Sequence, residues 1–480
     1  MNRKMVLNIL GKILLLEAAL LTLPLITSLI YKESVALSFI ITIAIALILG
    51  LILYFIARNP NKVFFAKEGF LIVALSWVGM SVIGSLPFVI SGEIPNFVDA
   101  FFETVSGFTT TGASILTNVE SLSHGMLFWR SFTHWLGGMG VLVFIMAIIP
   151  SFSDRSIHIM RAEMPGPIIG KIVPRAKQTA KILYLIYIVM TVLEIIFLAL
   201  GDMPLFDSIL HAFGTAGTGG FGIKAASIGA YGAYSQWVIA VFMFLFGINF
   251  NLYYLLLLRH IKSIFKSGEL WCYVSVFLVA SGLITYNILP RYENISDAIR
   301  NSVFQVSSIM TSTGYATTDF NMWPTLSKGI LLLLMFMGAC AGSTGGGLKV
   351  SRVIILFKSI IRELRRMISP RSVTAVSFEG KKLDDNTISA TLNYFSLYMV
   401  SILAIFAVLS FDVMGFEENF SAAVSCFNNI GPGFGAIGPA GSYAGYSALS
   451  KLALSYTMLL GRLELYPMIV LFIPSVWKKK

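Results

Sequence analysis

Charged residues are scarce in this sequence. Asp, Glu, Lys and Arg together make up 12% of the 480 residues, whereas soluble domains carry about 25%. Hydrophobic residues make up 56% of the chain, so the protein cannot cover its own surface with polar groups. The composition excludes an ordinary soluble protein and indicates a membrane protein with lipid as its main solvent.

Cysteine and histidine are also scarce. The three cysteines, Cys272, Cys340 and Cys426, all lie in apolar segments, which argues against a disulfide framework and a cysteine-based metal site. The five histidines are scattered without the spacing of metal ligands. We expect His134, beside Trp135, to be packed rather than to bind a metal. No paired carboxylates or nucleophile–base set occur at membrane depth, so the sequence predicts neither an enzyme nor a covalent cofactor.

The basic residues gather in a few segments between the apolar ones and give the chain a net charge of +11. These segments are Arg3–Lys4, 58–67, 155–181, 259–266, 349–382 and 478–480. The intervening polar segments are acidic or mixed, for example around Asp99 and Glu103. Because basic loops stay on the cytoplasmic side, the alternation predicts that both termini are cytoplasmic. Basic charge of this kind indicates topology, and we expect no binding to nucleic acid.

Two plain apolar spans open the chain, at about residues 6–30 and 36–57. The first lacks a small-residue cleavage site and is long enough to cross a bilayer, so we expect a retained helix rather than a signal peptide. After them one pattern occurs four times: a full apolar span, a short outer segment with glycine, and a second span. The first spans are 69–91, 182–201, 270–289 and 389–411. The second spans are 125–150, 235–258, one that begins near Lys328 and one that ends near Pro474.

This repetition predicts the fold class. We expect an all-α polytopic membrane protein with four tandem helix–pore loop–helix repeats in pseudo-fourfold arrangement, plus two extra N-terminal transmembrane helices. The predicted parts are a two-helix membrane domain over 1–60 and pore repeats over 61–155, 156–262, 263–368 and 369–480.

The short outer segments carry the predicted pore. Each begins with a half-length helix, and Asp99 and Asp207 are the expected N-terminal caps of two of them. The predicted half-helices are 97–106, 205–216, 296–310 and 419–427. Each segment then reaches a glycine, and the repeats align on Gly112, Gly219, Gly314 and Gly431. One such glycine is more often a helix-packing contact. Four at the same topological position indicate non-helical backbone that lines an aqueous path.

A ring of such segments suits a monovalent cation. Glycine reaches dihedral angles that a Cβ forbids, so backbone carbonyls can point at the axis and replace the hydration shell of the ion. Inward-pointing helix C-termini carry partial negative charge and favour a cation. No ring of carboxylates, as calcium or magnesium would need, accompanies the glycines. The predicted selectivity filter comprises Thr110, Thr111, Gly112, Thr218, Gly219, Gly220, Ser312, Thr313, Gly314, Asn429, Ile430 and Gly431.

A glycine-rich run from Gly338 to Lys349 interrupts the second span of the third repeat. Each interior glycine costs a helix roughly 1 kcal/mol relative to alanine, so we expect a break that lines a cavity and obstructs the pore. The run does not match a phosphate-binding loop, because Leu348 precedes Lys349. A packing kink without a gating role is the alternative. The predicted gate comprises Gly338, Gly342, Ser343, Thr344, Gly345, Gly346, Gly347, Lys349 and Arg462.

Arg462 lies in the last predicted span, where a charge is costly and normally faces a cavity or a partner. Glu464 is two positions away and is therefore a poor partner on the same helix. We expect Arg462 to hydrogen-bond carbonyls of the glycine-rich run and to repel cations until the run moves. A structural arginine that pairs with another helix is the alternative.

The four glycine motifs, in this order, resemble those of the Trk/Ktr/HKT superfamily of potassium transporters. The extra N-terminal spans and the loop around residues 165–175 make the chain similar to the membrane subunits of bacterial Trk systems. Gly112 meets the family rule that glycine in the first loop accompanies potassium, and serine there sodium. Gly217, where members often have serine, and Tyr315, where phenylalanine is common, depart from the pattern without removing a filter carbonyl.

The resemblance implies potassium bound in the pore, a bacterial inner-membrane location and gating by the glycine-rich run. It also implies a homodimer with one pore per protomer and a cytoplasmic ring of TrkA-type regulatory subunits, which would bind any nucleotide themselves. A symporter coupled to H+ or Na+ is the alternative. The repeats run in the same orientation, and the spans hold little acid beyond Glu194 and Glu464 to support coupling.

Overall fold

The computed structural model describes residues 2–58, 66–140, 176–371 and 374–477. Our predictions for the loop around residues 165–175 and for the end of the span 125–150 lie outside the described residues. The described part is mostly helical, and six of its helices are long and apolar enough to cross a membrane. A seventh span results if a bent pair of helices is counted as one.

The N-terminal pair of spans is present as predicted. It consists of α1 (Arg3–Leu20), continued by α2 (Thr22–Ile30), and α3 (Ala36–Ile56). Two glycines let α1 and α3 approach closely, since a Cβ on Gly11 would lie 2.8 Å from the carbonyl oxygen of Gly50. Small residues at such crossings are typical of helix packing in lipid.

The first span and the half-helix of each repeat also match the predicted ranges. The first spans are α4 (Ala66–Ser91), α9 (Ala176–Ala199), α14 (Gly268–Ile288) and α18 (Asp385–Leu409). The half-helices are α5 (Phe97–Phe108), α10 (Leu205–Gly217), α15 (Ile295–Met310) and α19 (Phe416–Phe427). Large apolar side chains stay exposed along the first spans, with Leu185, Leu278 and Val400 all more than 60% exposed. A surface of this kind requires lipid around it.

The second spans of the second and fourth repeats are shorter than predicted. Of all four second spans, the first two are α6 (His124–Gly138) and α11 (Ala233–Phe246), which turns by 89° into α12 (Phe250–Leu257). The third is α16 (Thr325–Met337), separated from α17 (Val350–Ile368), and the fourth is α20 (Ala448–Arg462), followed by α21 (Tyr466–Val470) and α22 (Pro474–Trp477). The predictions of continuous spans over 235–258 and up to Pro474 are therefore wrong, whereas the break in the third repeat is confirmed.

The break between α11 and α12 has a physical reason that lies far away in the sequence. The carbonyl of Gly247 accepts a hydrogen bond from the N–H of Cys340 at 3.0 Å, and the N–H of Phe250 donates to the carbonyl of Gly342 at 3.1 Å. Asn249 caps α12 by accepting from the N–H of Asn251. Because the glycine-rich run satisfies the backbone groups that the break frees, the span can bend at membrane depth.

The remaining elements are short. They are α13 (Ile261–Phe265), the antiparallel strands β1 (Ser377–Phe378) and β2 (Lys381–Lys382), and six 3-10 turns. The turns are Val119–Ser121, Ser227–Ala230, Leu289–Arg291, Phe320–Met322, Gly435–Ile437 and Tyr443–Gly445.

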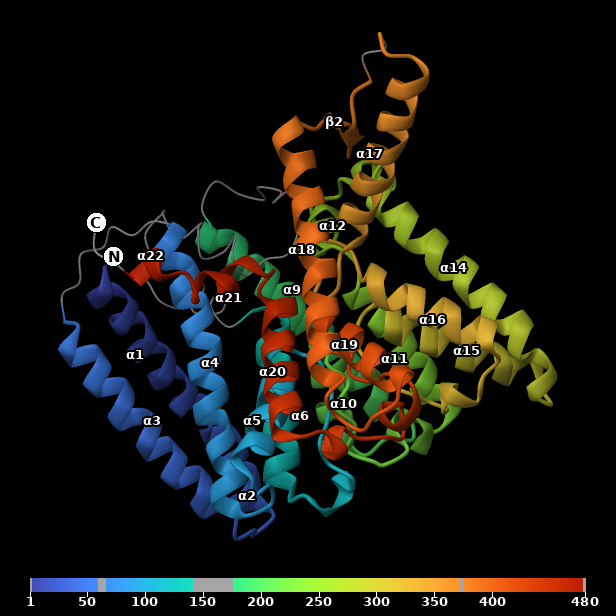
Figure 1. Cartoon of the computed structure of the whole chain (residues 1–480). Helices are drawn as coiled ribbons and strands as arrows, with labels where there is room; N and C mark the ends of the chain where they lie inside the picture. The colour runs from blue at the N-terminus through green and yellow to red at the C-terminus, as the bar shows by residue number, and fades with distance from the viewer. Residues whose placement is uncertain (1, 59–65, 141–175, 372–373, 478–480) are drawn as a thin grey trace.

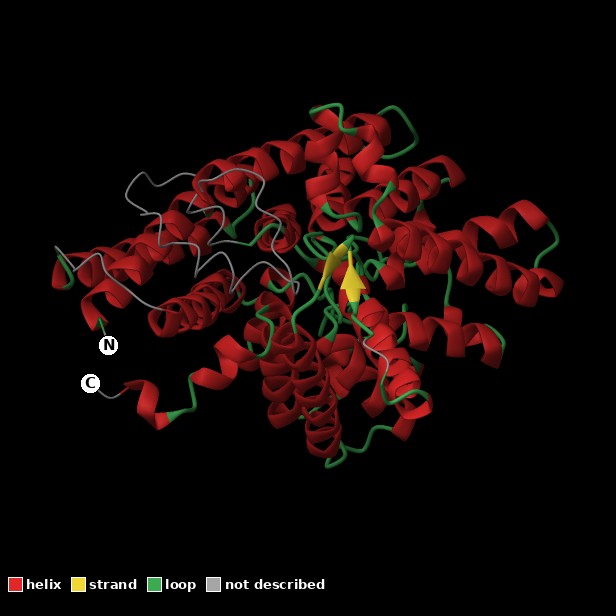
Figure 2. Ribbon diagram, turned by 90° about the horizontal axis from the view of Figure 1, so that it is seen from above, coloured by secondary structure: helices red, strands yellow, loops and turns green. Residues whose placement is uncertain are grey.

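Helices surround a centre that is filled with loops (Figure 2). Both termini lie at one end of the helical bundle, and α17 and the β-hairpin project from the same end (Figure 1). We call this end the terminal side, and the opposite end, where the half-helices begin, the mouth side. The central loops are the filter segments and the glycine-rich run.

Candidate ion-conduction site

All four half-helices end in the same backbone turn. Within two residues of each helix end one residue has a left-handed conformation, with φ between 54° and 58° at Thr110, Thr218, Ser312 and Asn429. The next N–H donates to the carbonyl five residues earlier at 2.8–3.0 Å, as from Thr111 to Ser106 and from Gly219 to Gly214. This is the Schellman motif of a helix C-terminus. Three of the four left-handed residues are Thr or Ser. For residues other than glycine the left-handed conformation costs roughly 1–2 kcal/mol.

This turn fixes how the repeats correspond. The glycine two positions after the left-handed residue has φ between 72° and 100° in each repeat, at Gly112, Gly220, Gly314 and Gly431. Gly220 is therefore the equivalent of Gly112, and our alignment on Gly219 is one residue out of register. The sequence Gly217–Gly220 contains three glycines, so spacing alone did not show which one has the positive φ. The predicted triplets, 110–112, 218–220, 312–314 and 429–431, do correspond.

The four glycines touch their neighbours in cyclic order. A Cβ on Gly112 would lie 2.0 Å from the carbonyl oxygen of Gly219, and one on Gly220 would lie 1.9 Å from that of Thr313. In the same way Gly314 faces the carbonyl oxygen of Ile430 at 2.0 Å, and Gly431 faces that of Thr111 at 2.6 Å. The fourth segment thus closes on the first. Any side chain at these positions would collide with a backbone carbonyl, so the ring requires glycine for space as well as for φ.

A chamber of about 130 Å³ lies on the mouth side of this ring. All four glycines of the ring line it. Its charged lining residues are Arg130 and Lys224, and no carboxylate is among them. In the described part of the chain no group of three or more His, Cys, Asp or Glu residues could hold a metal ion. The site therefore offers an ion mainly backbone and amide or hydroxyl oxygen.

Two buried side-chain oxygens of the filter triplets have no hydrogen-bond partner among the described residues. They are Oγ1 of Thr110 and Oδ1 of Asn429, which occupy equivalent positions at the helix ends. A buried oxygen without a partner costs about 1–3 kcal/mol. A weakly hydrated cation or a water molecule at this level would give both oxygens the partner that they lack.

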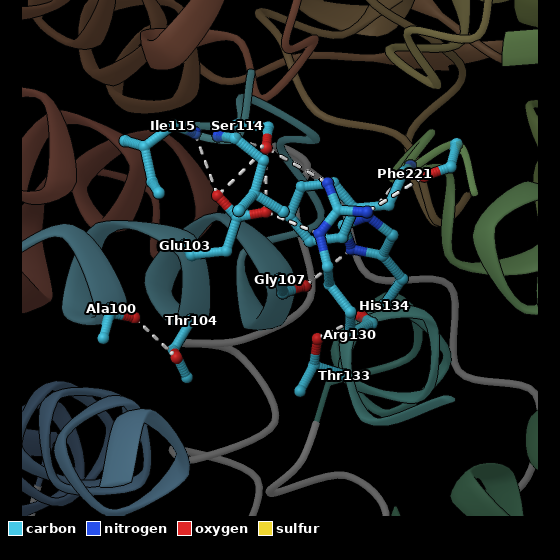
Figure 3. Close-up of polar contacts among 12 residues, drawn as sticks. Ala100, Glu103, Thr104, Gly107, Ser114, Ile115, Arg130, Thr133, His134 and Phe221 are labelled. Atoms are coloured by element: carbon cyan, nitrogen blue, oxygen red, sulfur yellow. Dashed lines mark hydrogen bonds and ion pairs between the residues drawn. The ribbon is translucent and has the colours of Figure 1, made fainter. Parts of the chain in front are cut away.

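A buried ion pair holds the first two filter segments together (Figure 3). Nε of Arg130 on α6 donates to Oε1 of Glu103 on α5 at 2.5 Å, and the two side chains are 4% and 0% exposed. The guanidinium also donates to the carbonyl of Gly222 at 2.9 Å and lies 3.7 Å from the ring centre of Phe221. The Glu103 carboxylate accepts from Oγ of Ser114 at 3.0 Å. The pair therefore connects the backbone that follows the first filter segment with the backbone that follows the second.

His134 is the second contact between these segments. Its Nδ1 lies 2.7 Å from the carbonyl oxygen of Gly107, and its Nε2 accepts from the N–H of Phe221 at 3.2 Å. Donation from Nδ1 and acceptance at Nε2 require the neutral ring. His134 is fully buried, as expected for a packed residue.

Arg130 and its pairing with Glu103 were not predicted from the sequence. The available signal was a charge inside each of two apolar segments, because buried charges at membrane depth come with partners. The expectation that Asp99 and Asp207 are caps is wrong. Asn96 and Pro204 occupy the cap positions. Asp99 lies in the first turn and accepts from Nζ of Lys451 at 2.6 Å, and Asp207 accepts from the hydroxyl of Tyr231.

The glycine-rich run lies directly beneath the ring, on its terminal side. The N–H of Gly346 donates to Oγ of Ser312 at 2.5 Å. A Cβ on Gly346 would lie 2.3 Å from the carbonyl oxygen of Asn428, and one on Gly345 would lie 2.7 Å from that of Thr311. The run therefore contacts the bases of the third and fourth filter segments. Of the other predicted gate residues, Gly338, Gly342 and Gly347 have positive φ, and Ser343 donates to the carbonyl of Cys340.

Two basic residues donate hydrogen bonds to carbonyls of this run. Nη1 of Arg462 donates to the carbonyl of Thr344 at 2.8 Å, so the expected contact between Arg462 and the run is present. Its Nη2 donates to the carbonyls of Gly137 and Gly138 at the end of α6, at 2.5 and 2.6 Å. Lys349 donates to the carbonyl of Gly345. Arg462 thus joins the run to both α6 and α20.

Glu464, two residues after Arg462 in the sequence, forms an ion pair with Arg352 of α17. Glu464 and Leu465 have φ of 60° and 65°, and α20 ends at Arg462, two residues before Glu464. The pair therefore connects the end of the fourth repeat to the helix that follows the glycine-rich run.

These features define a mostly helical, multi-pass membrane protein with a ring of four backbone segments at its centre, of the kind that passes an ion. The family model for TrkH, described as "Cation transport protein", matches residues 36–479. The chain belongs to the TrkH family, as the resemblance of its motifs implied.

Individual relatives agree along their whole lengths. The "Trk system potassium uptake protein TrkH" of Salmonella typhimurium is 37% identical over 489 residues, with both chains fully covered. The protein of the same name from Escherichia coli K12 is 36% identical over 490 residues, again with full coverage. The crystal structure of the potassium transporter TrkH from Vibrio parahaemolyticus superposes with a TM-score of 0.90 at 31% identity and covers 100% of both chains.

Proposed function

We propose that this chain takes up potassium through the ring formed by its four filter segments. The observation that carries the proposal is the cyclic contact of Gly112, Gly220, Gly314 and Gly431 with the carbonyls of neighbouring segments. Carbonyls gathered around one axis replace the hydration shell of a large monovalent ion. The relatives are named potassium uptake proteins, and this name supports potassium as the ion and a transport role rather than catalysis.

The electrostatics of the ring support a cation. The C-termini of all four half-helices lead into the filter segments, and each brings a partial negative charge. The chamber contains no carboxylate, so a divalent ion would lack the full negative charge that it needs. We therefore assign the twelve residues of the four triplets as the filter, with the mouth side facing the cell exterior.

We propose the glycine-rich run as the gate. It lies against the bases of two filter segments, and Ser312, Lys349 and Arg462 all hold its backbone. In this arrangement an ion that leaves the ring meets the run and the charge of Arg462. Opening requires the run to move away from Thr311 and Asn428, which breaks these hydrogen bonds.

The homodimer and the cytoplasmic nucleotide-binding partner are proposed from the family resemblance. The terminal side offers a surface suitable for the cytoplasmic partner, because α17 exposes Phe357, Ile361 and Leu364 on one face beside several arginines.

The homodimer can be tested by mass. Light scattering of the purified protein should give twice the chain mass of 52.7 kDa. A single-chain mass would contradict the dimer without affecting the filter.

The proposed transport is tested by ion flux into liposomes that hold the purified protein. Potassium, rubidium and sodium entry is compared under an imposed membrane potential. We expect potassium and rubidium to enter well above sodium, and the preference to be lost in Gly314→Ser, whose side chain would collide with Ile430. Gly282→Ser is the matched control, because a Cβ at Gly282 meets nothing within 4 Å. Equal sodium entry, or flux that depends on a proton gradient, would contradict a passive potassium pore.

A further inference from the structure

A groove of about 440 Å³ lies between α16 and α19, apart from the ion path. None of its lining residues lines the chamber outside the filter. It opens on the surface, since Gly329, Phe416 and Glu417 are exposed. Its size falls within the range of about 300–1,000 Å³ that is typical of ligand sites.

The groove is polar at one end and apolar at the other. Thr325, Lys328 and Glu417 belong to the first turns of α16 and α19, on the mouth side. Leu332 and Phe420 line it one turn further along these helices. Because α16 also exposes Leu326 and Leu333, a groove of this polarity matches a lipid, with its headgroup at the bilayer surface and its chain along the helices.

The polar end carries one charge of each sign. Nζ of Lys328 lies 3.5 Å from Oε1 of Glu417, and the side chains are 27% and 59% exposed. At this separation the pair is loose, so both groups retain hydrogen-bonding capacity for a ligand. A headgroup that carries both a phosphate and an ammonium is complementary to the two together.

Gly329 keeps the groove open. It lies inside α16, where glycine costs about 1 kcal/mol relative to alanine. A Cβ at this position would meet nothing within 4 Å. No packing among the described residues therefore requires this glycine, and any larger residue would extend into the groove.

The inner wall of the groove touches the filter region. Phe434 is 3% exposed, and its N–H donates to Oγ of Ser421 at 2.9 Å. Its ring packs against Phe320 at a centre distance of 5.6 Å. Phe434 follows Gly431 by three residues, so a molecule in the groove would contact the backbone segment just beyond the fourth filter segment.

We propose that the groove binds one zwitterionic phospholipid of the phosphoethanolamine class. Its phosphate contacts Lys328, its ammonium contacts Glu417, and the upper part of an acyl chain lies along Gly329 and Phe420 against Phe434. A purely anionic headgroup would offer Glu417 no partner from the lipid, and an uncharged one would leave Lys328 and Glu417 with only their loose contact to each other. The proposed lipid site requires that the protein lies in a bilayer, and it does not depend on which ion the protein transports.

Native mass spectrometry of the purified protein tests the site. The protein is titrated with phosphatidylethanolamine, phosphatidylglycerol or diacylglycerol. We expect one phosphatidylethanolamine to be retained by the wild type and by Gly282→Leu, a control at another exposed helical glycine with open space. Gly329→Leu should bind it about tenfold more weakly, and Lys328→Gln and Glu417→Gln should each reduce the preference over phosphatidylglycerol.

Three results would overturn the proposal. The first is equal retention by Gly329→Leu and Gly282→Leu. The second is equal binding of phosphatidylglycerol that Glu417→Gln does not change. The third is cross-linking of Gly329→Cys to a second copy, which would assign the groove to a protein interface. Because these measurements record bound mass and not flux, they stand or fall independently of the proposed potassium selectivity.

Discussion

Arg462 donates a hydrogen bond from Nη1 to the carbonyl oxygen of Thr344 at 2.8 Å. The same side chain reaches the carbonyls of Gly137 and Gly138 at the end of α6. One guanidinium therefore fixes the glycine-rich run against two helices, and it brings a positive charge to the path beneath the filter. These two effects make Arg462 the first residue to change in a test of the gate.

We expect Arg462→Ala to raise the potassium flux of the closed protein. A hydrogen bond from a charged group contributes about 1.5–3 kcal/mol, so loss of the contact should shift the closed–open balance about tenfold or more. Rubidium uptake into liposomes without any regulatory partner measures the leak, with Arg366→Ala, an exposed arginine of α17, as the control. Unchanged leak in Arg462→Ala would leave the residue a purely structural role.

The buried pair of Glu103 and Arg130 should be needed for stability. Removing one partner of a buried ion pair leaves an uncompensated charge and costs about 3–5 kcal/mol. We expect Glu103→Gln to lower the thermal unfolding temperature, measured in detergent by intrinsic fluorescence. Asp99→Asn, which breaks the more exposed pair with Lys451, should have a smaller effect.

A double variant separates charge compensation from shape. In Glu103→Gln combined with Arg130→Met no unpaired charge remains, and part of the lost stability should return. A double variant that is as unstable as the sum of the single ones would show that the two charges do not interact in the folded protein.

The sequence allowed the local elements to be predicted better than their ends. The half-helix predicted over 205–216 is observed at Leu205–Gly217, because its apolar pattern and its terminal glycine are local signals. The break at Gly247 was missed, because the hydrogen bonds that stabilise it come from Cys340 and Gly342, about a hundred residues away. Apolar periodicity does not reveal such partners.

In the candidate site, too, local features could be predicted from the sequence and long-range contacts could not. The four filter triplets could be located from their repetition, but which glycine of the second segment has positive φ depends on contact with Thr313. The ion pair of Arg130 and Glu103 depends on two segments that meet only in the folded chain. Sequence repetition predicts which residues are equivalent between repeats, whereas contacts between distant segments become visible only in the three-dimensional structure.

Proton coupling can be tested at Glu194, one of the acids inside the spans. Glu464 is already paired with Arg352, so it is poorly suited to carry a proton. Glu194 is fully buried on α9. For a passive pore we expect Glu194→Gln to leave potassium flux under an imposed potential within about twofold of the wild type, since no proton transfer is needed. Potential-driven uptake that requires an inward pH gradient, and loses that requirement in Glu194→Gln, would establish the symport alternative.

Lys224 should weaken ion entry at low ionic strength. It lines the chamber outside the filter, where the charge of Arg130 is already compensated by Glu103. In the part of the chain that the structure describes, its ammonium has no hydrogen-bond or ion-pair partner. At about 10 Å in water two unit charges repel by roughly 0.4 kcal/mol, which halves the occupancy of the mouth by a cation.

Lys224→Gln should therefore raise initial potassium uptake about twofold in dilute buffer. The gain should vanish at about 1 M of an impermeant salt, where the Debye length is about 3 Å. Lys32→Gln, which removes the same charge from an exposed position on the mouth side, should show no gain. The preference for potassium over sodium should stay unchanged, because the filter carbonyls are not altered. A gain that persists at high salt, or a changed ion preference, would mean that Lys224 acts on the shape of the filter segments and not through its charge.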